Sequence, residues 1–241
     1  MKLFYTLLFL FPTFVNSQSL IANYNITKTI ELKLAAGNKN ITLEMNGFLY
    51  RQGNRYIYWE QPAYLKKYPN GSIDVSIDNH IYSYALNTDS VQNLFYTDYD
   101  RHILRSGAMN PGALVNEFEF EDGYGENWEF KPETKLINGL KCQLALDRDQ
   151  WRVWFCPDIP ARSGVFNVKG LPGLIVEADW LPMKAHYMLS SYDTQTTIND
   201  EVFAPKQFNG TIIKGGKLKG FKPASEKTKT EKRIELLKQN N

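Results

Sequence analysis

The sequence predicts a mainly β protein, folded as an antiparallel meander that forms a curved open sheet or half-barrel, with a short C-terminal helix. Apolar and polar residues alternate over residues 73–78 and 117–121, which places one strand face in the core and the other in water. Turn signals such as Asn70-Gly71 and Asn138-Gly139 recur between such runs. Because sheets twist, short strands joined by these turns curl into a curved layer.

The composition is that of a folded chain, with 14% aromatic and 22% charged residues. Residues 1–17 have the pattern of a secretory signal: Lys2 precedes an apolar run from Leu3 to about Val15, with Ser17 at the cleavage point. The run is too short for a transmembrane span of about 20 apolar residues. We therefore expect a protein that is exported to the periplasm or the outer envelope.

Residues 18–213 suit one large β-rich domain. Residues 214–241 form a basic tail, expected to be partly helical or disordered, in which nine Lys and Arg stand against three Glu. The whole chain carries only +2, so the rest is acidic, which together with export disfavours nucleic-acid binding. The tail could contact an anionic surface, although a solvated tail explains the same pattern.

Cys142 and Cys156 lie in two strand-like runs around a polar tip. If residues 148–150 form a three-residue loop, Asp147 faces Trp151 and Cys142 faces Cys156, at a cross-strand separation that a disulfide tolerates. After export the two thiols should bond, which would stabilise the fold by roughly 3 kcal/mol. The alternative is a pair of buried free thiols.

Gly170, Pro172 and Gly173 crowd into one turn, after which Leu174 to Val176 resemble a strand buried on both faces. Pro172 and Gly173 fit the central positions of a type II turn, with positive φ at Gly173, while Gly170 would let a neighbouring backbone approach. A Gly-rich anion-binding loop is the alternative. Pro172 removes one N–H donor and no helix pattern follows, so the sequence favours a structural corner.

The segment Gly170–Ile175 is the sequence motif of the GLPGLI family of exported bacterial proteins, and the chain resembles that family over about residues 128–180. The resemblance includes Cys142, Trp154 and Asp158-Ile159-Pro160. It implies envelope export and a β-rich fold, and no chemistry.

The sequence shows no catalytic motif, no cofactor site and no metal site. His80, His102 and His186 stand alone, without the paired spacing of a zinc motif. Acidic residues allow a carboxylate-dependent hydrolase, with Asp98, Asp100, Glu117 and Glu119 as the candidates. The sequence favours the simpler interpretation, in which these residues form an acidic solvent-exposed face.

Aromatic and polar residues interleave over residues 55–65 and 80–86. Some of these rings could line the concave face of the sheet and hold a ligand, and the candidates are Tyr56, Tyr58, Tyr82 and Tyr84. The alternative is that tyrosines cover a half-exposed sheet face, as their β-propensity favours. The leading hypothesis is a noncatalytic envelope protein that binds a ligand or a protein partner through this face. The alternatives are the hydrolase and a purely structural envelope component.

Overall fold

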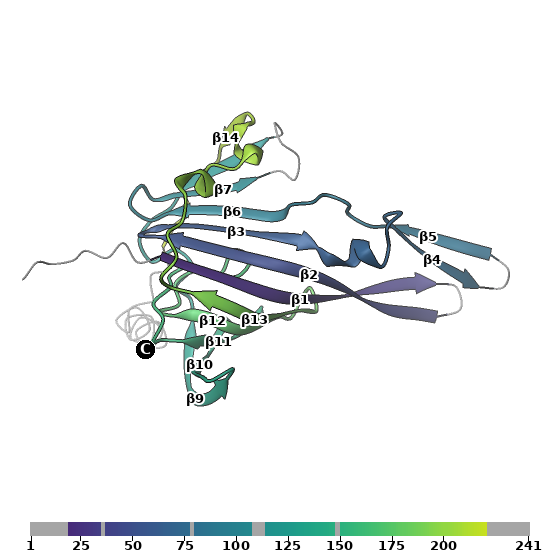
Figure 1. Cartoon of the computed structure of the whole chain (residues 1–241), viewed down its shortest axis with the longest axis horizontal. Coiled ribbons are helices and arrows are strands. Elements are labelled where there is room, and N and C mark those ends of the chain that lie inside the picture. Colours follow the sequence, from purple (N-terminus) through teal and green to yellow (C-terminus); the bar gives the residue numbers. More distant parts are fainter. Residues whose placement is uncertain (1–18, 35–36, 78–79, 108–113, 148–149, 221–241) are drawn as a thin grey trace, which may run out of the picture.

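The computed structural model describes residues 19–34, 37–77, 80–107, 114–147 and 150–220 (Figure 1). The predicted signal and the predicted C-terminal helix lie outside these residues. Fourteen strands are present in the described parts: β1 (Ser19–Leu34), β2 (Gly37–Gln52), β3 (Arg55–Pro62), β4 (Ser72–Ile77), β5 (His80–Ala85), β6 (Gln92–Asp98), β7 (Ile103–Gly107), β8 (Val115–Glu119), β9 (Glu129–Ile137), β10 (Leu140–Asp147), β11 (Trp151–Cys156), β12 (Leu174–Trp180), β13 (Ala185–Asp193) and β14 (Ile212–Lys214).

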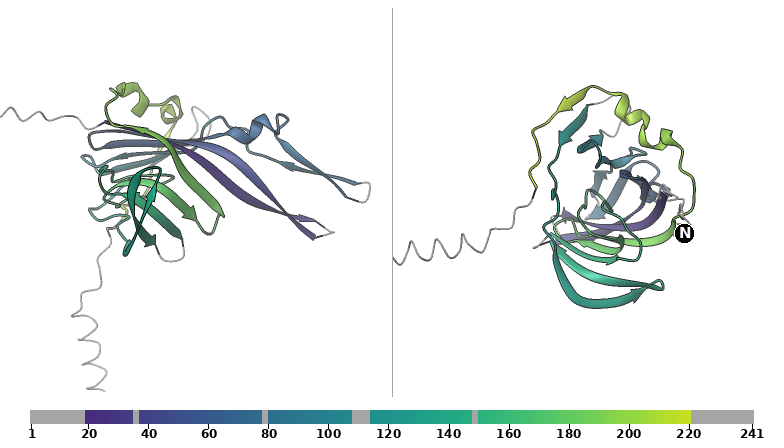
Figure 2. Two further views of the ribbon diagram at one scale, coloured as in Figure 1. Left: turned by 60° about the horizontal axis from the view of Figure 1, so that its bottom comes forward. Right: turned by 90° about the vertical axis from the view of Figure 1, so that its left-hand side faces the viewer.

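Twelve strands form one open curved sheet in the order β14-β8-β7-β6-β3-β2-β1-β13-β12-β11-β10-β9. All neighbours are antiparallel except β14 and β8, and Figure 2 shows the curvature in the view along the strands. The predicted fold class is therefore confirmed. Short 3₁₀ turns supply the only helix within the described ranges: η1 (Ala63–Lys66), η2 (Asp200–Phe203) and η3 (Lys206–Asn209). None of them is long and apolar enough to cross a membrane.

The hairpins follow the predicted turn chemistry. Asn138 and Gly139 both have positive φ, of 50° and 80°, which two-residue hairpin turns need, and they join β9 to β10. In the next hairpin Asp147 pairs with Trp151, as predicted, and the same register brings Cys142 and Cys156 to the following pair of positions. Both cysteines are buried, and no bond joins their sulfur atoms in the structure. Burial, and then the neighbouring Cys156, raise the pKa of Cys142 to about 11. The disulfide stays a prediction.

The segment Pro157–Gly173, here named the cover loop, packs on the inner face of the curved sheet. The Arg162 N–H donates to the Tyr56 hydroxyl over 3.1 Å, and the Tyr99 hydroxyl donates to the Arg162 carbonyl over 2.9 Å. Phe166 of this loop, at a φ of 54°, inserts between Phe95 and Trp180, with ring centroids 5.0 and 4.4 Å away. The cover loop therefore occupies the concave face, where the sequence placed a ligand.

The corner at the end of the cover loop is built differently from the prediction. Positive φ, of 77°, occurs at Gly170 and not at Gly173, and the Leu174 N–H donates to Ile159 instead of closing a type II turn. Gly173 is needed for close approach, because a Cβ there would lie 2.1 Å from the Cys156 carbonyl oxygen. Leu174, Ile175 and Val176 are buried on both faces, as predicted.

The distal parts of β1 and β2 and the separate β4–β5 hairpin project together from the sheet, as the right side of Figure 1 shows. Apolar side chains of both hairpins belong to one core cluster, among them Leu32, Leu43, Ile73 and Val75. At the other end of the sheet, the Glu121 backbone N–H donates to the Leu218 carbonyl, and the Leu218 N–H donates to the Glu119 carbonyl. The described part of the basic tail therefore follows the sheet edge.

Candidate functional site

The site is built from the outward-facing residues of β3. Even-numbered side chains of this strand point to the inner core, so Tyr56 and Tyr58 are 3% and 2% exposed. The prediction that they face a ligand is wrong, because the cover loop and the curved sheet bury this face. The odd-numbered Ile57 and Trp59 point to the opposite, outer face.

The other two predicted tyrosines, Tyr82 and Tyr84, lie on the projecting β5 strand. They pair with Val75 and Ile73 across the β4–β5 hairpin. Tyr82 is 39% exposed, whereas Tyr84 is half-buried and donates its hydroxyl to the Lys33 carbonyl over 3.3 Å. The structure does not bring these two tyrosines together with Trp59.

A cavity of about 280 Å³, here named the Trp59 pocket, opens between the outer face of the sheet and the segment that carries η2 and η3. Its walls are predominantly apolar: Ile57, Trp59, Val91, Leu94, Val202 and Pro205, with Glu201 and Gln207 beside them. Protein sites for small ligands are typically apolar hollows of a few hundred Å³, so this cavity is at the small end of that class.

The wall formed by η2 is fastened to β3 through Arg55. The guanidinium of Arg55 pairs with Asp200 over 2.6 Å and lies 4.8 Å from the centre of the Phe203 ring. The Asn199 side chain caps η2 by accepting a hydrogen bond from the Glu201 N–H over 3.1 Å. These contacts hold the pocket open as a feature of the folded chain.

Trp59 also continues a row of rings on the outer face. It stacks on Phe48 and on Tyr50 of β2, with ring centroids 5.2 and 5.1 Å apart. All three rings are half-buried. Stacked rings give a rigid, flat contact surface, which favours the binding of apolar or planar groups over chemistry on them.

A polar arrangement lies on the inner face around Glu60, which is fully buried. Its carboxylate accepts from Lys28 over 2.7 Å, from Asn93 over 2.5 Å and from the Tyr58 hydroxyl over 3.0 Å. Asn93 sits at a β-bulge opposite Trp59, and its φ of 50° turns its amide toward Glu60. Burial, and then Glu60, raise the pKa of Tyr58, which keeps the phenol protonated.

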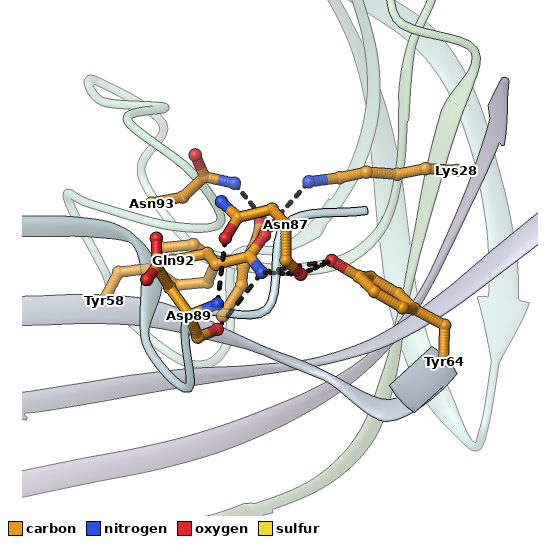
Figure 3. Close-up of polar contacts among 8 residues, drawn as sticks. Lys28, Tyr58, Tyr64, Asn87, Asp89, Gln92 and Asn93 are labelled. Carbon is orange, nitrogen blue, oxygen red and sulfur yellow. Dashed lines mark hydrogen bonds and ion pairs between the residues drawn. The ribbon is translucent and has the colours of Figure 1, made fainter. Parts of the chain in front are cut away.

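Two further observations describe this polar cluster. The Tyr187 hydroxyl is buried near Glu60, and burial and then Glu60 raise its pKa. Gln92 extends the cluster by donating to the Tyr64 hydroxyl over 3.1 Å and to the Asp89 carbonyl over 3.2 Å (Figure 3). Glu60 lines neither the Trp59 pocket nor the largest polar hollow described below, and its side chain is fully buried. We assign the cluster to the architecture of the core.

The four candidate carboxylates do not all converge on one pocket, although Glu117 and Glu119 together line one polar hollow of about 180 Å³ beside Lys214 and Lys217. Asp98, the last residue of β6, is buried and accepts from the backbone N–H groups of Asp100 and Arg101 in the following turn. Asp100 accepts from Asn54. Glu117 pairs with Arg105 over 2.7 Å, and Glu119 lines an open polar hollow of about 570 Å³ with residues of both charges. This arrangement is typical of turn and surface stabilisation.

Sequence reasoning missed the Trp59 pocket for an identifiable reason. The alternation within residues 55–60 predicts two faces of a strand. Whether the even-numbered or the odd-numbered side chains face outward depends on the layer that covers each face. The wall from η2 and η3 is about 140 residues away in sequence from β3. A short apolar pattern, Val202 and Phe203 beside Pro205, was the only local signal.

Comparisons with known proteins give little beyond this geometry. No family model matches the chain, and no curated protein matches it. Among solved structures, the chain resembles that of a DUF1329 family protein from Desulfovibrio piger at 9% identity, covering 78% of this chain and 90% of that chain. The TM-score is 0.31, and a likeness at this level carries no argument about function.

Proposed function

We propose that this protein is a noncatalytic binding protein of the bacterial envelope that holds an apolar group of its ligand in the Trp59 pocket. The observation that carries the proposal is the pocket itself, an open cavity with apolar walls beside a stacked aromatic row. The lining supplies contact area instead of reactive groups, since Glu201 is its one titratable residue and is exposed.

Burial of an apolar group is the free-energy source that this site offers. Removing apolar surface from water contributes about 25 cal/mol per Å². A ring or a short acyl segment in the pocket would also stack on the edge of the Phe48–Trp59–Tyr50 row. Ligands without such a group have little to gain there.

The test uses N-phenyl-1-naphthylamine, a dye whose fluorescence rises in apolar surroundings. We expect saturable binding to the protein and loss of binding in Val202→Trp, which fills the pocket. The control, Ile81→Ser, removes an apolar side chain that is 73% exposed on the projecting hairpin, and should bind the dye normally. Equal binding by Val202→Trp and the unmodified protein, or loss in the Ile81 variant alone, contradicts the proposal.

The envelope location is supported by the pattern of residues 1–17 and by the resemblance to the GLPGLI family. A purified mature protein should begin at Gln18, which N-terminal sequencing measures directly. A chain that retains Met1 in the periplasmic fraction, or remains in the cytosol, contradicts this part of the proposal.

A further inference from the structure

We propose that Glu177, Asp179 and His186 form a binding site for a divalent transition-metal ion, with Zn²⁺ as its best-suited occupant. One carboxylate oxygen from each acid and one ring nitrogen of His186 all lie within 4.8 Å of one another. This site lies on β12 and β13, whereas the Trp59 pocket involves β3, β6, η2 and η3, so the two proposals are independent.

Strand register creates the group. Asp179 pairs directly with His186 across β12 and β13, and Glu177 lies two residues earlier on the same face of β12. Both strands are interior to the sheet, each hydrogen-bonded on two sides, so their backbones are fixed. His186 stands alone in the sequence, and only the pairing of β12 with β13 brings it to the two acids.

The donor set selects the kind of ion. Imidazole together with carboxylates suits Zn²⁺ and its neighbours, whereas Ca²⁺ takes six to eight oxygen ligands. Zinc ligands at about 2.0–2.2 Å from the ion lie roughly 3.3 Å from one another. The Nδ1 of His186 and the Oδ1 of Asp179 are 2.8 Å apart and share a proton in a hydrogen bond. Zn²⁺ would displace that proton to solvent and separate these two atoms slightly, while the longer Glu177 side chain closes on the ion.

The three ligands are accessible. Their side chains are 19%, 31% and 39% exposed for Glu177, Asp179 and His186. Three protein ligands leave at least one coordination position open to water or to a ligand oxygen.

A cation occupies part of the site in the structure. Lys135 of β9 pairs with Glu177, and its ammonium lies 4.4 Å from the centre of the Trp154 ring. Zn²⁺ must compete with this ammonium for the carboxylate. Removal of Lys135 should therefore strengthen metal binding, which is a result that a purely structural Asp–His pair does not predict.

The experiment titrates the protein, prepared without a polyhistidine tag, with ZnCl₂ in an isothermal calorimeter. We expect one bound Zn²⁺ per chain, a loss of at least about tenfold in affinity for His186→Ala and Asp179→Asn, and a gain for Lys135→Met. Ca²⁺ and Mg²⁺ should give no saturable heat. Circular dichroism of each variant verifies that it is folded.

His102→Ala is the matched control, because His102 pairs with Asp122 over 3.0 Å on the surface and belongs to no such three-ligand group among the described residues. It should bind Zn²⁺ with unchanged affinity. Cobalt substitution separates thiolate binding from this site, since ligation by Cys142 or Cys156 would add a charge-transfer band. Absence of Zn²⁺ binding, unchanged affinity in His186→Ala, or an equal loss in His102→Ala overturns the proposal.

Discussion

Removal of the Lys28 ammonium should be the most costly single change of charge in the inner core. Glu60 is fully buried and its charged partner, Lys28, has a side chain that is only 18% exposed, at an Nζ–Oε2 distance of 2.7 Å. At an effective dielectric constant of about 20, this pair attracts by about 6 kcal/mol. Part of that energy offsets the desolvation of Lys28, so Lys28→Met should lower the free energy of unfolding by about 3–5 kcal/mol at pH 7.

A second substitution at Glu60 should restore part of the stability that Lys28→Met loses. Lys28→Met/Glu60→Gln removes the stranded charge while the Gln carbonyl still accepts from Tyr58 or Asn93. The double variant should therefore be more stable than Lys28→Met alone, with a remaining cost of about 1–2 kcal/mol for imperfect hydrogen bonding.

Urea denaturation with linear extrapolation gives the free energy of unfolding of the unmodified protein, of Lys28→Met and of the double variant. Lys131→Met is the control, because Lys131 pairs with Glu129, whose side chain is 67% exposed; such pairs contribute about 0–1 kcal/mol. A double variant less stable than Lys28→Met, or a Lys28→Met cost no larger than that of the control, would refute the assignment of Lys28 as the partner that permits burial of Glu60.

Three further predictions test the cover loop and the cysteines. Gly173→Ala should destabilise the folded protein strongly, because its Cβ would lie 2.1 Å from the Cys156 carbonyl oxygen. The melting temperature should fall further than in the control Gly216→Ala, where a Cβ meets nothing within 4 Å. Equal decreases in the two variants would contradict the close approach at Gly173. Burial lowers the pKa of Lys169 to about 7, whereas the unfolded chain keeps a value of about 10.4. The unfolded chain therefore binds more protons between these two values, and the free energy of unfolding should rise with pH from about 7 to 9. Urea denaturation of Lys169→Met at several pH values should lack this rise, and a pH profile equal to that of the unmodified protein would count against the burial of the amine. Protein recovered from the periplasm should contain the Cys142–Cys156 bridge, shown by a mass two hydrogens lower and by resistance to alkylation after unfolding without reductant; two alkylated thiols would indicate the buried free pair.

The sequence by itself determined the class of the fold and several of its turns. Period-two alternation and Asn-Gly signals act over a few residues, so they specified strands, the β9–β10 turn at Asn138-Gly139 and the register of Asp147 with Trp151. The unbroken apolar run Leu174–Val176 likewise predicted burial on both faces, because a strand covered on both sides needs no polar alternation.

Only the tertiary structure decided which face of each strand was open. By residue type, Tyr58 and Trp59 are equally suited to the exposed face of a sheet. In the structure Tyr58 is buried on the cover loop side of the sheet, whereas η2 and η3 leave a cavity beside Trp59. His186 lies beside Glu177 and Asp179 only because β12 pairs with β13. Alternation tells two faces apart but does not say what covers each, since that depends on contacts between segments far apart in the chain.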